Sequence, residues 1–133
     1  MTYEVERADI EGRFATLWGS TTPVAYSNVA FTPPADAEWV RLNILDNTTD
    51  EIGIGQPNAQ LHRFQGLIVV GIFTPLNTGE KRARQLADQV FSMFKSADFG
   101  SVTSWTPYVT VVGESDGYFQ VNVTTNFKRD EIT

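Results

Sequence analysis

The hydrophobic pattern of the chain begins with a helical period over residues 2–18. Apolar side chains recur there at the spacing of one helix face, at Ile10, Phe14, Leu17 and Trp18. Glu4 and Glu6 supply negative charge in the first turns, where the helix dipole favours it. Gly19 is typical of a helix end. The pattern therefore predicts one amphipathic helix at the start of the chain.

Extended segments follow the helix. Residues 24–31 form a short extended piece, which Pro33 and Pro34 end. Residues 38–45 alternate between apolar and polar side chains, which predicts a half-buried strand. Residues 63–73 are almost continuously apolar and rich in Val and Ile, which predicts a central strand covered on both faces. Between the two strands, residues 46–60 are rich in Asp, Asn, Thr, Gly and Pro and predict a long loop, a feature that is more often functional than idle.

A second helix is predicted over residues 79–96, with Thr78 as its N-cap. One face of it collects Ala83, Leu86, Ala87, Val90, Phe91 and Phe94, and we expect this face to pack on the sheet. Residues 102–112 and 118–127 then flank a turn over 113–117 and predict a C-terminal hairpin. The fold class is α+β: one domain over residues 1–133, with a single mixed or antiparallel β-sheet, an N-terminal helix, a second helix packed on the sheet and a C-terminal β-hairpin.

Charge and composition exclude several functions. The chain carries 16 acidic and 10 basic residues, a net charge of −6, whereas binding along nucleic-acid phosphates needs clustered bases. It has no cysteine, so disulfides and thiolate metal sites are absent. The N-terminus does not resemble a secretory signal, and the apolar run over 67–73 is too short to cross a bilayer. We expect a soluble, cytosolic protein without membrane contact.

Candidate chemistry is sparse. His62 is the single histidine, and one histidine in a chain without cysteine cannot form a histidine-rich transition-metal site. Nothing in the spacing indicates a serine or threonine nucleophile within its reach. The acids Asp46, Asp50 and Glu51 do not follow the ligand spacing of a calcium loop. We therefore predict no catalytic residue, no metal and no cofactor.

The positive charges of the second helix are the most informative anomaly. Lys81, Arg82 and Arg84 crowd its first turns, where the helix dipole disfavours cations by about 0.3–1 kcal/mol each. A solvated polar face explains them without any partner. The alternative is an acidic partner surface, and in a ring of identical subunits the segment with Asp46, Asp50 and Glu51 would supply it. These six residues are our predicted subunit interface.

The order of these segments resembles that of a known family, the tail terminator (tail completion) proteins of long-tailed bacteriophages and a related phage domain family of the same fold. The resemblance covers nearly the whole chain and is one of order, spacing and residue type. It is carried by Phe14 and Trp18; Tyr26 to Asn28; Phe31 to Pro34; Trp39 to Leu42; Arg63 to Val70; Pro75 and Gly79; Ala83, Leu86 to Asp88, Phe91 and Phe94; and Tyr118, Val121 and Val123.

The resemblance implies a structural role in virion assembly. Such proteins form a six-membered ring that caps the tail tube, stops its polymerisation and presents a surface to the head–tail connector. The expected partners are further copies of the chain, with the ring closing in some cases only on the tube, and the tube and connector proteins. DNA passes through the lumen without specific binding, and an acidic chain would repel its phosphates. We expect the chain at the head-proximal end of the virion tail after assembly in the host cytoplasm, and the 46–60 loop to be mobile before assembly and ordered in the ring.

Two alternatives remain at this stage. The first is another phage neck component, such as a head-completion or connector protein. The second is a small-ligand-binding or enzyme domain with an aromatic pocket that draws on Tyr26, Trp39, His62 or Trp105. A deep pocket with convergent polar groups would support the second alternative.

Overall fold

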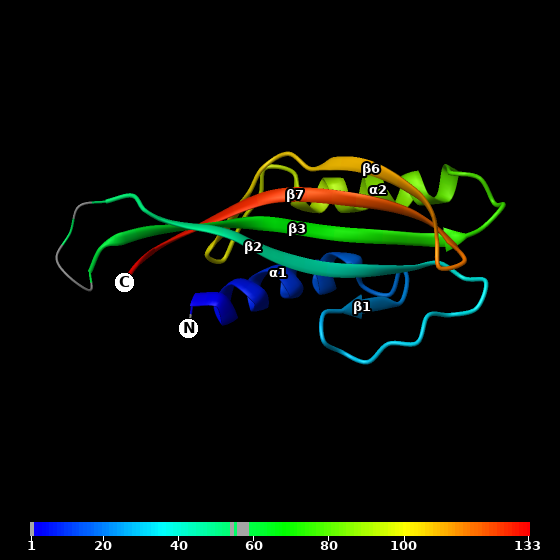
Figure 1. Ribbon diagram of the computed structural model, residues 1–133, viewed down its shortest axis with the longest axis horizontal. Helices are drawn as coiled ribbons and strands as arrows, with labels where there is room; N and C mark the ends of the chain where they lie inside the picture. The colour runs from blue at the N-terminus through cyan, green and yellow to red at the C-terminus, as the bar shows by residue number, and fades with distance from the viewer. Residues whose placement is uncertain (1, 54, 56–58) are drawn as a thin grey trace.

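Two helices and one mixed sheet make up the described part of the protein, and this confirms the predicted α+β class (Figure 1). The computed structural model describes residues 2–53, 55 and 59–133. In chain order the elements are α1 (Thr2–Trp18), β1 (Val24–Tyr26), β2 (Trp39–Glu51), β3 (Leu61–Pro75), α2 (Lys81–Phe94), β4 (Asp98–Phe99), β5 (Val102–Ser104), β6 (Tyr108–Ser115) and β7 (Tyr118–Ile132).

The sheet is built around two long strands. Its order is β1-β2-β3-β7-β5-β4, and β6 lies beside β7 next to β5. β3 and β7 pair antiparallel over fifteen residues each, from Leu61 opposite Ile132 to Pro75 opposite Tyr118, and they run the length of the molecule (Figure 1). β2 follows β3 over almost the same length, whereas β1 adds a short parallel edge against residues 40–42 of β2.

Both helices pack on one face of this sheet. Alternate side chains of the three long strands turn to that face because the side-chain period of a strand is two. There they form a single core with one stripe of each helix. Its most deeply buried members include Ile10, Phe14 and Trp18 of α1, Leu86, Val90 and Phe94 of α2, and Val40, Leu42, Ile68, Val70, Ile72, Val121, Val123 and Phe127 of the strands.

The opposite face of the sheet has no helix over it in the part of the chain that the structure describes. A small aromatic cluster covers one end of it, where Trp39 stacks on Phe73 at 4.1 Å between ring centroids and Tyr118 meets both rings edge-on. The rest of this open face mixes polar and apolar side chains, such as Asn43, Leu45, Asn122 and Asn126.

The predicted loop over residues 46–60 is wrong in its first part. Residues 46–51 continue β2 as an arm along the start of β3, which pairs with the end of β7 on its other side, after a bulge between Asp46 and Thr48. Their side chains are exposed, so they lack the apolar alternation that identifies a half-buried strand. Of the remaining loop, residues 54 and 56–58 lie outside the described residues.

Smaller differences have local causes. The N-cap of α2 is Glu80 rather than Thr78, whose hydroxyl donates to the Pro75 carbonyl oxygen at 2.7 Å. The strand predicted over 102–112 is divided into β5 and β6, with Pro107, which has no backbone N–H for a ladder, between them. Leu17 was expected in the core, but its side chain is 53% exposed and borders a groove.

Candidate functional site

The predicted acidic residues lie along β2, which ends at one end of the long axis. Asp50 and Glu51 occupy the last positions of the strand, opposite Arg63 and His62 of β3. The Glu51 carboxylate lies 4.0 Å from His62 Nε2, while Arg63 is held instead by Asp130 of β7 at 2.9 Å. The arm therefore carries charges of both signs, and its acids on β2 are exposed to solvent.

Asp46 has a different environment from the other two acids, because it lies beside the buried carboxyl of Glu6 on α1. Burial, together with the neighbouring Asp46 carboxyl, raises the pKa of Glu6 to about 7 against the opposing effect of Arg129. Arg129 Nε donates to Glu6 Oε1 at 3.2 Å, and both side chains are 2% exposed. Asp46 thus takes part in a contact that holds α1 to the sheet.

The Arg129 side chain is enclosed by aromatic rings. Its guanidinium carbon lies 4.0 Å from the centroid of the Phe64 ring and 5.7 Å from that of Tyr3, distances at which cation–π attraction operates. Its two terminal nitrogens have no hydrogen-bond partner within the described residues, although Nη1 lies 3.7 Å from the Glu131 carboxylate. Charge, rather than full hydrogen bonding, stabilises this residue.

The predicted basic residues begin α2. Arg82 binds Glu38 at 2.8 Å, just before β2, and Arg84 binds Glu80 at 3.2 Å. Lys81 is exposed. Two of the three cations at the unfavourable end of the helix therefore have an acidic partner inside the chain. Both are solvent-exposed ion pairs, which contribute about 0–1 kcal/mol each to stability. Either arginine can therefore exchange its acidic partner for another at low cost.

The acidic and basic groups are separated along the molecule. β2 ends at the tip of the arm, whereas α2 begins at the other end of the long axis, where β3 ends (Figure 1). Asp50 and Glu51 therefore cannot meet Lys81, Arg82 or Arg84 of the same chain.

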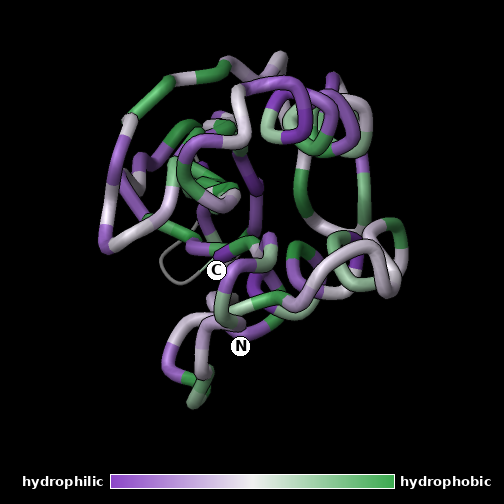
Figure 2. The backbone as a smooth tube through the Cα atoms, turned by 90° about the vertical axis from the view of Figure 1, so that its right-hand side faces the viewer, coloured by the Kyte–Doolittle hydropathy of each residue, from purple (hydrophilic) through white to green (hydrophobic). Residues whose placement is uncertain are grey.

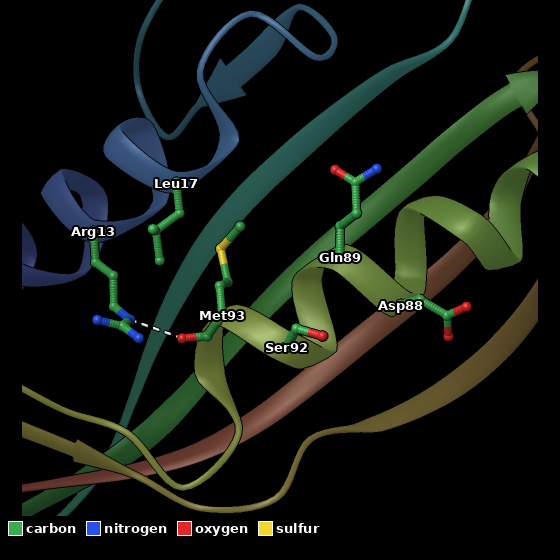
Figure 3. Close-up of a pocket in the computed structure, with 6 residues that line it drawn as sticks. All are labelled: Arg13, Leu17, Asp88, Gln89, Ser92 and Met93. Atoms are coloured by element: carbon green, nitrogen blue, oxygen red, sulfur yellow. Dashed lines mark hydrogen bonds between the residues drawn. The ribbon is translucent and has the colours of Figure 1, made fainter.

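A groove of about 540 Å³ lies between the two helices (Figure 3). Its side chains are Arg13 and Leu17 from α1 and Asp88, Gln89, Ser92 and Met93 from α2. Arg13 Nε donates to the Met93 carbonyl oxygen at 2.7 Å and so ties the helices together. The groove brings no histidine, and no serine beside a base, into one place. Its lining is that of a surface depression between packed helices.

The residues of the small-ligand alternative do not converge. Trp39 lies in the aromatic cluster of the open face, Tyr26 packs against the main core, and His62 begins β3 at the far end. The Trp105 side chain is 43% exposed. In the described part of the chain, no three His, Asp or Glu side chains are grouped as metal ligands. No helix there has the length and apolar character needed to span a membrane.

Comparisons with known proteins agree with this architecture. The family model described as "Phage tail terminator protein" matches residues 7–127. A solved structure whose name states no function is 20% identical and superimposes with a TM-score of 0.72 over 100% of this chain and 96% of its own, which shows the same fold. No curated protein matches the sequence. The family match spans most of α1, all of α2 and nearly all of the sheet, and it confirms the resemblance found in the sequence. The chain therefore belongs to the phage tail terminator family, a family of structural rather than enzymatic proteins of the phage tail.

Proposed function

We propose that this protein closes into a ring on the last layer of the tail tube, ends tube polymerisation and offers its outer face to the head–tail connector. Family membership supports the role at the tail. The observation that supports a ring is that Asp50 and Glu51 lie at one end of a long molecule and Lys81, Arg82 and Arg84 at the other.

A head-to-tail contact follows from this separation. Each copy would present Asp46, Asp50 and Glu51 to the Lys81, Arg82 and Arg84 side chains of the next copy. Such a contact joins two different surfaces, and it closes when the rotation between neighbours divides a full turn. Six copies are the number that the family resemblance implies. DNA would pass through the lumen, and the net charge of −6 would keep its phosphates from adhering.

The first experiment is mass by light scattering over a concentration series, at low and moderate salt, with and without tube protein. A discrete oligomer near six subunits supports the ring. Its dissociation at moderate salt would implicate the charged contacts, because salt screens exposed pairs. Electron microscopy of tube protein should then show tubes that stop growing when the chain is added. Tubes that grow unchanged in the presence of a bound chain would contradict the capping role and favour another neck component.

Charge reversal tests the contact itself. Arg82→Glu should weaken self-association by about tenfold or more, a cost of about 1.4 kcal/mol. Glu38→Gln is the matched control, since it removes the same intrachain pair with Arg82 but leaves the surface positive. Asp50→Arg, mixed with the Arg82→Glu variant, should restore part of the association. Equal association of both single variants and the wild type would remove Arg82 from the interface.

A further inference from the structure

β6 leaves one side of the sheet open. Seven of its eight residues pair with β7, and no other strand in the described chain lies along its outer side. Four large side chains on it are between 42% and 52% exposed, namely Tyr108, Val109, Val111 and Val112. In the end-on view of Figure 2, β6 follows the periphery of the molecule with hydrophobic segments. An exposed apolar edge strand is unusual, since such edges promote pairing with another chain.

The backbone of β6 can donate and accept hydrogen bonds outward. The hairpin turns at Asp116 and Gly117, whose φ angles of 49° and 81° are those of a type I′ turn. In such a hairpin, Ser115 and Tyr118 bond to each other, and pairing then alternates along β7. The backbone N–H and C=O groups of Thr110, opposite Asn122, therefore point toward β7. Those of Val109 and Val111 point away from the sheet.

The features that usually protect an edge are weak here. β6 contains no Lys, Arg or Pro, and its single acid, Glu114, lies next to the turn. The bulge between Val111 and Gly113 disturbs that same end. The stretch from Tyr108 to Val111 remains regular and open.

A second open edge lies on the other side of the same sheet. β1 pairs with residues 40–42 of β2, and beyond them the outer side of β2 has no strand partner in the described chain. This free edge covers residues 43–51, nine residues against the eight of β6. Two edges of matching length on opposite sides of one sheet are what a repeated head-to-tail contact requires.

The helix face carries complementary charge above the two edges. Arg82 and Gln89 lie on the flank of α2 toward α1, as the pair with Glu38 and the groove show. At 100° per residue, Lys95 and Arg84, which pairs with Glu80, lie on the opposite flank, and since α2 packs on β3 and β7 this flank overlooks β6. Beside the edge of β2 lie Asp46 on the strand and, on α1, Glu4 and Glu11, which share the single cation Arg7, so that the group is net acidic.

We propose that neighbouring copies join by pairing β6 of one copy with the outer edge of β2, residues 43–51, of the next. The two sheets then form one continuous sheet, in which main-chain hydrogen bonds satisfy the outward groups of Val109 and Val111. Arg84 and Lys95 of α2 in one copy then face Asp46, Glu4 and Glu11 beside β2 of the other. This contact rests on the proposed ring and names the strands that build it; Arg84, on the flank of α2 over β6, lies nearer to these strands than Arg82.

Cysteine cross-linking tests this contact directly, because the chain has no cysteine of its own. Thr110 and Leu45 are exposed, and each occupies an open-face position on its strand. We would make Thr110→Cys, Leu45→Cys and the double variant, and treat each at assembling concentration with a bismaleimide that reaches about 10 Å. Residues on neighbouring strands lie about 5 Å apart, so this reach tolerates a register offset of about two residues.

The proposal expects a ladder of cross-linked oligomers from the double variant and a cross-linked dimer from the two single variants mixed together. Each single variant alone should remain uncross-linked. Cross-linking of Thr110→Cys alone would mean that β6 pairs with itself, which overturns the proposal. A ring detected by mass without any cross-link overturns the strand contact and leaves the ring. A chain that stays monomeric with and without tube protein overturns both.

Discussion

The buried carboxyl of Glu6 should make the stability of the protein fall as pH rises. Burial raises the pKa of Glu6 to about 7 from an ordinary value of 4.5, so the folded chain holds the proton more tightly than the unfolded chain does. The stabilisation is complete below pH 4.5 and is lost as pH rises through 7. One pKa unit corresponds to 1.36 kcal/mol, so between pH 5 and 8 Glu6 alone should lower the free energy of unfolding by about 2.5 kcal/mol.

Glu6→Gln isolates this contribution, because glutamine has nearly the same shape and stays neutral at every pH. The variant should match the wild type in stability near pH 5 and exceed it by about 2 kcal/mol at pH 8. The assay is urea unfolding from pH 5 to 8, followed by the fluorescence of the buried Trp18 at concentrations below self-association. Glu4→Gln is the matched control, because Glu4 lies on the same helix but is exposed and binds Arg7. Its loss should leave the dependence of stability on pH the same as in the wild type.

Parallel stability curves for the wild type and Glu6→Gln would refute this reasoning. They would mean that Glu6 stays ionised in the folded protein because the attraction of Arg129 at 3.2 Å exceeds the cost of burial. In that case Glu6→Gln should instead be destabilising at every pH, since it would leave a buried guanidinium without its anion.

Two further predictions concern packing and can be checked by the same unfolding assay. Gly66→Ala should destabilise by about 1–3 kcal/mol, because its Cβ would lie 2.5 Å from the Leu45 carbonyl oxygen and 2.8 Å from the Phe127 ring; a neutral result would mean that β2 can shift. Trp39→Phe should lower the free energy of unfolding less than Trp18→Phe does. The buried Trp39 Nε1 has no hydrogen-bond partner within the described residues, whereas Trp18 Nε1 donates to Thr22 Oγ1 at 3.1 Å. A larger loss for Trp39→Phe would contradict this assignment of partners.

Elements with a buried face could be predicted from the sequence. Ile10, Phe14 and Trp18 give α1 its helical period, and the apolar run around Ile68 identifies β3, because burial on a helix or strand leaves a period in the sequence. The arm of β2, residues 46–51, has no such period in its sequence. Its residues from Thr48 to Glu51 are held by pairing with β3 while both faces are exposed, and such a segment reads as a loop.

The candidate surfaces were predicted in part. The charges at both ends are visible in the sequence, but their partners are not: Arg82 meets Glu38 across 44 positions, and Glu6 meets Arg129 across 123. The two flanks of α2 separate Arg82 from Arg84, although they are two residues apart. The exposed edge of β6 could not be predicted, because a segment rich in valine is equally typical of a buried strand.

The long ladder between β3 and β7 has a mechanical consequence. A pull along the molecule is directed along these strands, so that their hydrogen bonds over fifteen paired residues would be loaded in shear and would have to break together. Resistance to such a pull is governed by the rate of unfolding rather than by equilibrium stability. We therefore expect the chain to be stiffest along its long axis, and single-molecule stretching in that direction to require a higher force than peeling β6 from its edge.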